Sequence, residues 1–374
     1  MKSFECIILN HLKYVTTPLM DPYQLAYRAN RSVEDTVILA THHILNHLES
    51  ANTYARILFM DFSSAFNTIN PAKLFNTLLD MNIDPCICHW IHSFLWNRQQ
   101  KVKIKNTTSS PLFLSTGTPQ GCVLSPWLFS LYTNKLTSHH SSVNLYKYAD
   151  DSTIIGLITN NQETEYRAQI NQAVTWCTDH DLILNSSKTT ELIIDPRRQP
   201  SPKTPVLIKG ESISITDTFK LLGTHISNNL KWKINADHIY KKAQQRLFHL
   251  RQLKKFRVRS HLLLHFYTAI VESILTFSIT VWFGSLDSLS RKKLQRIINR
   301  ASKIIGTPLP SLDSLYHKRT LRRARKIISD PTHPAHYAFQ LLPSGRRYRT
   351  IASRTTRLKN SFIPTAINFL NSER

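Results

Sequence analysis

Two adjacent aspartates, Asp150 and Asp151, lie between two apolar runs at 143–148 and 153–157. Two short apolar runs with a polar break between them predict a β-hairpin that carries both carboxylates at its tip. Like charges about 4 Å apart repel by roughly 1 kcal/mol in water and by several times more near a protein surface. A cation is therefore expected beside this pair, and a divalent metal ion is the usual solution in proteins.

A third acid, Asp61, ends another apolar run at 57–60, about ninety residues before the pair. For any one of these aspartates alone, capping of a turn is the better interpretation. Three acids at strand ends suit hard cations that take oxygen ligands, and they suggest two-metal phosphoryl transfer. Adjacent central strands of one sheet would bring Asp61 beside the hairpin tip.

The charge of the chain is unevenly distributed. Its 374 residues, 41% of them hydrophobic, suffice for a buried core and for two or three domains, and the net charge is +24. Residues 1–239 carry 21 Lys+Arg against 19 Asp+Glu, a net of +2, whereas residues 240–374 carry 27 against 5, a net of +22. This asymmetry favours a near-neutral catalytic part followed by a nucleic-acid-binding part over a merely soluble basic helical region.

The cysteines and the apolar stretches favour an intracellular protein. The five cysteines show no paired CxxC spacing, and Cys86 and Cys88 form only a weak zinc pattern, so reduced thiols are expected. The amino-terminal residues lack the apolar core of a signal peptide. The longest apolar stretch, 262–283, contains a histidine and a glutamate, which favours a buried helix over a membrane span. We therefore expect a protein of the nucleus and cytoplasm without a membrane anchor.

Capping residues and apolar periodicity predict the order of the elements. Helices are expected over 32–47, 70–81, 85–96, 125–136 and 162–178, and strands over 55–62, 101–105, 190–195, 206–209 and 219–226, besides the acid hairpin at 143–158. Residues 196–205 read as a loop or linker, and the pattern is helical from 237 onward. Mixed helices and strands followed by helices alone predict an α+β unit joined to a helical one.

Several longer segments resemble one known family. They are QLAYRANRSVEDTV (24–37), ILFMDFSSAFNTI (57–69), STGTPQGCVLSPWLFSLYTN (115–134), YADD (148–151), LNSSKTTELII (184–194), FKLLGTHISNNLKW (219–232), KKAQQRLFHLRQLKKF (241–256), FYTAIVESILTFSITVW (266–282) and LPSGRRYR (342–349). In this order they resemble the reverse transcriptase of a non-LTR (LINE-type) retrotransposon, of the kind abundant in fish genomes. The resemblance covers nearly the whole chain.

The resemblance implies a right-hand polymerase fold. Fingers and palm with an antiparallel sheet core would occupy 1–233, a helical thumb 234–330 and a basic carboxy-terminal tail 331–374. It also implies RNA-directed DNA synthesis with an RNA template, a DNA primer or target, dNTPs and two Mg²⁺ ions.

The resemblance further implies a role for each matching residue. The metal-binding catalytic acids would be Asp61, Asp150 and Asp151. The nucleotide would be bound by Phe62, Phe66, Gln120, Gly121 and Lys188, and the primer or template by Arg28, Arg31, Leu222 and Gly223. Phe66 stands where the family places a bulky steric gate that favours dNTPs, although core packing is the better interpretation of this ring from the residues alone.

Two parts of the family pattern have no match in the sequence. An endonuclease domain ahead of the polymerase and the first strand of the fingers are missing, so we expect an amino-terminally truncated polymerase whose activity in isolation is weak or absent. The main alternative is a catalytically inactive remnant that only binds nucleic acid. A related polymerase (an intron maturase, a telomerase or an RNA-dependent RNA polymerase) is a third interpretation.

Overall fold

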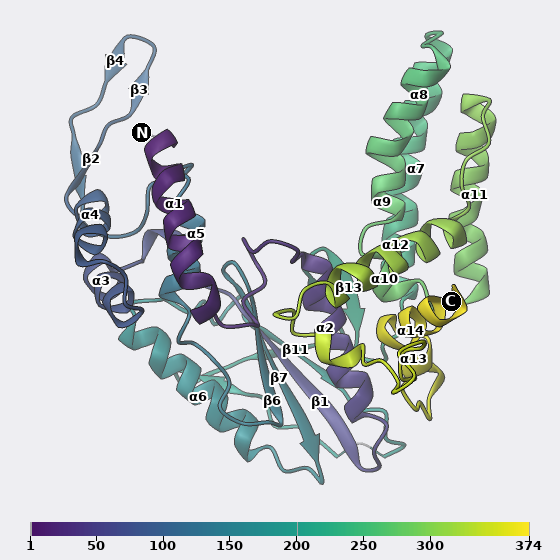
Figure 1. Ribbon diagram of the computed structural model, residues 1–374, viewed down its shortest axis with the longest axis horizontal. Coiled ribbons are helices and arrows are strands. Elements are labelled where there is room, and N and C mark those ends of the chain that lie inside the picture. The colour runs from purple at the N-terminus through teal and green to yellow at the C-terminus, as the bar shows by residue number, and fades with distance from the viewer. Residues whose placement is uncertain (1, 200, 374) are drawn as a thin grey trace. The chain divides into compact units, whose positions relative to one another are not determined.

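The computed structural model describes residues 2–199 and 201–373 (Figure 1). The chain divides into two compact units that each combine separate stretches of sequence. The first unit comprises residues 1–31, 56–191 and 202–215, and the second comprises 32–55, 192–201 and 216–374.

A five-stranded sheet has the order β11-β8-β1-β7-β6. Its strands are β1 (Thr53–Met60), β6 (Val143–Tyr148), β7 (Asp151–Thr159), β8 (Thr190–Ile194) and β11 (Ser214–Thr216). Every residue of the central strand β1 is buried, which agrees with its nearly continuous apolar sequence. The predicted strands at 55–62 and 190–195 and the hairpin at 143–158 are confirmed, with shifts of one or two residues at their ends.

The first unit also contains helices and short strand pairs. They are α1 (Lys2–Thr16), α3 (Pro71–Asp80), α4 (Pro85–Leu95), α5 (Ser125–Tyr132) and α6 (Thr164–Asp179), with the short pairs β2 (Arg98–Gln100) and β5 (Leu112–Leu114), β3 (Lys103–Ile104) and β4 (Thr107–Thr108), and β9 (Leu207–Ile208) and β10 (Glu211–Ser212). The Asn70 side chain accepts a hydrogen bond from the Ala72 N–H (3.0 Å), which confirms the predicted start of α3.

The prediction of a strand over 101–105 is wrong for most of that segment. Only β3 forms there, in a two-residue pairing with β4. Both strands are exposed, and they lie beyond β2 (Figure 1). An alternating sequence forms a longer strand only where one of its faces can pack on a core, and this segment has none. The predicted helix over 125–136 ends earlier than expected, at Tyr132.

The second unit is dominated by helices, as its sequence pattern predicts. They are α2 (Val33–His47), α7 (Lys233–Lys255), α8 (Ser260–Phe266), a π-helix (Tyr267–Glu272), α9 (Ser273–Leu275), α10 (Ile279–Trp282), α11 (Ser288–Ile305), α12 (Leu312–Ile328), α13 (Thr356–Lys359) and α14 (Phe362–Ser372). The hairpin of β12 (Thr218–Leu221) and β13 (Thr224–Ser227) also belongs to this unit. The combined α+β class with a helical second part is therefore confirmed.

The apolar stretch 262–283 is not the single buried helix that we expected. It contains the π-helix and a break between α9 and α10, where Ser278 has a left-handed φ of +46°. The Thr276 hydroxyl donates to the Glu272 carbonyl, and such side-chain bonds to the backbone compete with regular helix. Among the described helices, none combines the length and apolar character that crossing a bilayer requires.

A fully buried arginine lies in the middle of the sheet. The guanidinium of Arg56 on β1 donates two hydrogen bonds to the carboxylate of Glu191 on β8, at 2.7 and 2.6 Å. A third bond reaches Glu163 (2.7 Å), and the Tyr166 hydroxyl donates to Glu191 (2.8 Å). Burial and the charge of Glu191 raise the pKa of Tyr166 well above its ordinary value. The two-pronged contact fixes the position of β1 relative to β8.

Replacement of Arg56 by alanine should lower the free energy of unfolding by about 3–5 kcal/mol, because it leaves the buried Glu191 carboxylate without its counter-charge. Chemical denaturation followed by circular dichroism measures the change. Arg198→Ala is the control, since its side chain is exposed, and it should change the stability by less than about 0.5 kcal/mol. Equal effects of the two substitutions would contradict a structural role for Arg56.

Candidate active site

The acid hairpin ends in a tight turn. Strands β6 and β7 pair antiparallel, with Tyr148 opposite Asp151, so that only Ala149 and Asp150 form the connection. Ala149 has a φ of +57°, a left-handed conformation that L-residues rarely adopt and that two-residue hairpin turns often require. Both carboxylates therefore lie at the hairpin tip, as the sequence predicts, and both are exposed.

Asp61 follows β1, which neighbours β7 in the sheet. The segment before β8 holds its backbone in place: the Asp61 N–H donates to the Thr189 hydroxyl (3.3 Å), and the Asp61 carbonyl accepts from the Asn185 N–H (2.9 Å). The side chain of Asp61 is half-buried. Neighbouring central strands thus carry Asp61 and the acid hairpin, and the charge of Asp61 acts on Asp151.

The three acids act on one another electrostatically. Asp151 keeps an exposed side chain, but its partial burial raises its pKa, and the charges of Asp150 and Asp61 raise it further. The pKa of Tyr27 is raised by burial and also by the charge of Asp150. Within the described residues, no lysine or arginine forms an ion pair with these three carboxylates. Among the described residues, the mutual repulsion of these acids is therefore not offset by an ion pair.

This donor set consists of carboxylate oxygens, the ligands that hard divalent cations prefer. The acids are nevertheless not assembled into a finished metal site. Across residues 2–199 and 201–373, no group of three or more His, Cys, Asp or Glu side chains is arranged so that it could hold an ion. The arrangement favours a cation electrostatically, but its coordination would require the carboxylates to draw together.

The two phenylalanines after Asp61 differ in their surroundings. Phe62 is buried, and its backbone forms an isolated bridge with Leu184. Phe66 is half-buried in a 3-10 turn, and its ring centroid lies 4.8 Å from that of Phe129 on α5. Packing thus fixes the ring of Phe66 while part of it stays accessible.

The loop before α5 is tied to the turn that carries Phe66. The Gly117 N–H donates to the Ile69 carbonyl (2.7 Å), and the Thr118 N–H donates to the Phe66 carbonyl (2.8 Å). Gln120 is exposed and lines a cavity of about 630 Å³. Gly121, with a φ of +77°, faces open space. The loop therefore presents accessible backbone near Phe66.

Arg98 lines the same cavity, although no sequence signal marked it. Its guanidinium donates to the carbonyls of Gly117 (2.9 Å) and Thr116 (2.7 Å). Burial lowers its pKa. Arg98 lies at the start of a short strand and belongs to no sequence motif. Its hydrogen bonds to the loop are therefore visible only in the structure.

Three further site residues predicted from the sequence, Lys188, Arg28 and Arg31, belong to the first unit but are not part of the acid hairpin. Lys188 is exposed in the segment that holds Asp61. Arg28 donates to the Asp21 carbonyl (3.0 Å), and Arg31 is half-buried at the end of the unit's first stretch.

Leu222 and Gly223 belong to the second unit, where they divide the segment 219–226, predicted as one strand, into an antiparallel hairpin. They connect β12 and β13 with φ values of +45° and +88°. A Cβ atom at Gly223 would lie 2.9 Å from the Phe277 ring, so the close approach favours glycine there.

Comparison with known families gives two matches. The sequence model described as "Reverse transcriptase (RNA-dependent DNA polymerase)" matches residues 1–226. The model described as "Alkylated DNA repair protein alkB homolog 8, N-terminal" matches residues 232–273.

Comparison with individual proteins finds transposon polymerases. The chain is 24% identical over 371 residues to the "Probable RNA-directed DNA polymerase from transposon BS" of Drosophila melanogaster, covering 94% of this chain and 40% of the relative. It is 24% identical over 244 residues to the "RNA-directed DNA polymerase from mobile element jockey" of Drosophila funebris, covering 62% of this chain and 26% of the relative. The chain thus spans two fifths or less of these relatives' length.

Among solved structures, apo telomerase from Candida Tropicalis aligns with a TM-score of 0.46 and 13% identity, over 100% of this chain and 58% of that chain.

Asp151→Asn should raise the melting temperature at neutral pH when no divalent cation is present. The raised pKa of Asp151 means that its charged form costs stability in the fold, and this cost disappears as the pH falls through the raised pKa. The gain should therefore shrink on acidification. Thermal unfolding across the acid range measures it, with Glu165→Gln as the control on an exposed helix position. A lower melting temperature for Asp151→Asn would contradict the charge repulsion.

Proposed function

We propose that this chain, which belongs to the reverse transcriptase (RNA-dependent DNA polymerase) family, extends a DNA 3′-hydroxyl on an RNA template as the polymerase of a non-LTR retrotransposon. One observation carries the proposal: partial burial raises the pKa of Asp151, and the charges of Asp150 on the same hairpin and of Asp61 from a distant segment raise it further. The names of the transposon relatives support the same activity.

The acids would hold the metal ions of the reaction. Asp61 and Asp150 would be the ligands of two Mg²⁺ ions, with Asp151 in support, and a bound cation would offset the repulsion among these carboxylates. When bound, the ions would lower the pKa of the primer 3′-hydroxyl and neutralise the departing pyrophosphate. The proposal requires the carboxylates to approach one another when the ions bind.

The surrounding residues would bind and select the nucleotide. The ring of Phe66, fixed against Phe129, would exclude a 2′-hydroxyl and so favour dNTPs. Gln120 and Gly121 would let the backbone approach the nucleotide closely. Phe62, being buried, would support this site from the core, and Lys188 would screen the pyrophosphate.

The template and primer would be bound elsewhere on the chain. Arg28 and Arg31 would contact the template or nucleotide, and the bend at Leu222 and Gly223 would contact the primer backbone. We assign fingers and palm to 1–233, the thumb to 234–330 and the tail to 331–374. Synthesis on a chromosomal DNA end would place the protein in the nucleus after its production in the cytoplasm.

Asp150→Asn should reduce dNTP incorporation by at least about 100-fold, because it removes a charge that the metal ions require. Primer extension on an RNA template with Mg²⁺ measures the rate. Asp80→Asn is the matched control, since Asp80 is an exposed acid paired with Lys135. Full activity of Asp150→Asn would exclude the proposed site. Nucleic-acid binding without any extension by the unaltered chain would favour the inactive remnant.

Phe66→Ala should increase the use of NTPs relative to dNTPs by at least about 10-fold, because it opens space for a 2′-hydroxyl. The ratio of extension rates with the two nucleotide sets measures the change. Phe113→Ala, at an exposed position of β5, is the control and should leave the ratio unaltered. An unchanged ratio in Phe66→Ala would assign this ring to packing alone.

A further inference from the structure

Helix α1 buries one acidic side chain. Glu5 lies in the first turn of this helix, and only 3% of the residue is exposed. Acidic side chains are almost never buried this deeply unless they are paired. Over residues 2–199 and 201–373, no lysine or arginine forms an ion pair with Glu5. Its burial therefore needs a compensating hydrogen bond.

Val123 supplies this hydrogen bond. Its backbone N–H donates to Oε2 of Glu5 at 2.7 Å, and the two residues are 118 positions apart in sequence. A hydrogen bond to a carboxylate is roughly twice as strong as one between neutral groups. Val123 follows the exposed pair Gln120 and Gly121, which we call the 120–121 turn, and it precedes α5. Glu5 thus holds the end of the loop that carries this turn.

Helix α1 is also joined to α5 at its other end. The indole N–H of Trp127 donates to the Thr16 hydroxyl (3.2 Å), and the Lys13 ammonium lies 5.4 Å from the centroid of the same indole ring. Both helices belong to the first unit (Figure 1). Because these contacts do not involve Glu5, α1 should keep its place beside α5 when only the Glu5 carboxylate is removed.

The two arms of the loop are held differently. Arg98 ties the upstream arm to β2. On the downstream arm, the Ser125 hydroxyl donates to the Pro119 carbonyl (2.8 Å), and Sγ of Cys122 lies 2.6 Å from the same hydroxyl. These downstream bonds are local, so they would move together with the loop. Among the described residues, Glu5 supplies the side-chain bond that ties the downstream arm to another element.

We propose that Glu5 is a positioning residue, which holds the Val123 N–H and so keeps the 120–121 turn where the incoming nucleotide contacts it. This role rests on the proposed function, which assigns Gln120 and Gly121 to nucleotide binding. Glu5 acts through the backbone of the loop and not on the reacting atoms. Its loss releases the turn, so nucleotide binding weakens while the hairpin acids and the rate of the chemical step stay unchanged.

Two substitutions test the bond by primer extension with the full chain. Glu5→Leu suits a buried position but removes the acceptor, whereas Glu5→Gln keeps an acceptor oxygen and serves as the rescue. Glu5→Leu should raise the KM for dNTPs by about 10-fold, the loss expected for one hydrogen bond to a charged group, while kcat changes by less than about 2-fold. Glu5→Gln should keep both constants within about 3-fold of those of the unaltered chain.

A second measurement gives the nucleotide affinity without catalysis. A primer that ends in a dideoxynucleotide forms the complex with RNA template, dNTP and Mg²⁺ but cannot react. Hydrogen–deuterium exchange of residues 119–124, followed by mass spectrometry as dNTP is added, reports both the mobility of the turn and its protection. Without dNTP, exchange should be at least about 10-fold faster in Glu5→Leu than in the unaltered chain or Glu5→Gln. Half-maximal protection of Glu5→Leu should need about 10-fold more dNTP.

Leu12→Ala is the control for a mere loss of stability. Leu12 is buried on the same helix, so its truncation should lower the melting temperature. It should leave the exchange of residues 119–124 and the KM for dNTPs unchanged. Glu5→Ala, which adds no bulk, takes the place of Glu5→Leu if the leucine variant does not melt cooperatively.

Each outcome decides the role of Glu5. Faster exchange with weaker dNTP binding in Glu5→Leu, and recovery of both in Glu5→Gln, support the positioning role. Unchanged exchange, faster exchange with unaltered dNTP affinity, or a fall in kcat alone overturns it. Failure of the unaltered chain to extend primers would contradict the proposed function, and the exchange titration would still decide whether Glu5 positions the turn for dNTP.

Discussion

Two buried cations hold the strands that carry the acids, and the rest of the site depends on them. Arg56 on β1 is paired with Glu191, and Lys147 on β6 is paired with Asp21 (2.9 Å). Lys147 also donates to two backbone carbonyls at 2.7 Å, although burial lowers its pKa. A buried charge is strongly destabilising once its partners are lost. These strands therefore tolerate little displacement.

The carboxylates near the sheet fall into two groups, one paired with buried cations and one without an ion pair among the described residues. Asp21 and Glu191 are buried and each forms an ion pair with a buried cation, so they specify how the strands fit together. Asp61 lies five residues after Arg56, and Asp150 and Asp151 follow Lys147 closely, yet no cation of the described chain pairs with these three acids. The unpaired acids repel one another, and a bound cation could offset this repulsion. The paired acids stabilise the sheet. The acids can repel one another because the strands beneath them are held rigidly.

The sequence predicts strands and turns whose signals are adjacent along the chain, but it does not predict contacts between residues far apart in sequence. The hairpin at 143–158 and the strand before Asp61 were predictable, because an apolar run and its polar end are adjacent in sequence. The anchoring of Arg56 was not, since Glu191 lies 135 residues away and an arginine within an apolar strand carries no signal of its partner. The break at Ser278 likewise depends on side-chain bonds to the backbone, which periodicity does not report.

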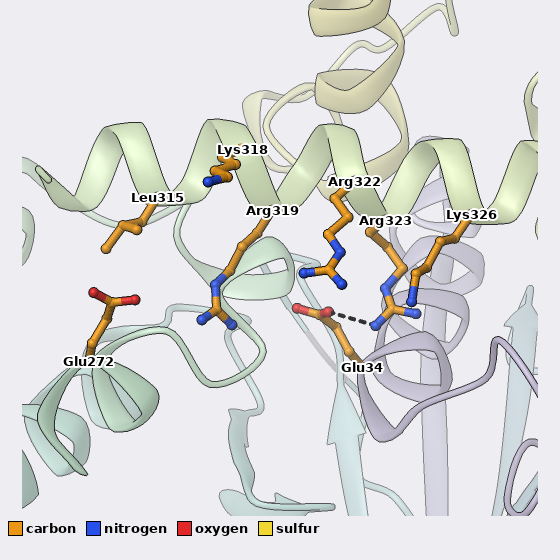
Figure 2. A pocket seen from close by; sticks show the side chains of 8 residues that line it. All are labelled: Glu34, Glu272, Leu315, Lys318, Arg319, Arg322, Arg323 and Lys326. Carbon is orange, nitrogen blue, oxygen red and sulfur yellow. Dashed lines mark ion pairs between the residues drawn. The ribbon is translucent and has the colours of Figure 1, made fainter. Parts of the chain in front are cut away.

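The net charge of a segment also says nothing about which distant residues its charged side chains contact. The excess of Lys and Arg in residues 240–374 favours a polyanionic partner, but a count does not distinguish a cation that holds the fold from one that is available to a ligand. On α12, Arg323 is committed to Glu34 and Asp35, which come from a separate stretch of sequence. Its neighbour Arg322 lines the same cavity as Arg323 (Figure 2), and among the described residues it has no such ion pair. Two adjacent arginines thus differ in their ion pairs, and only the three-dimensional arrangement shows which of them holds the fold.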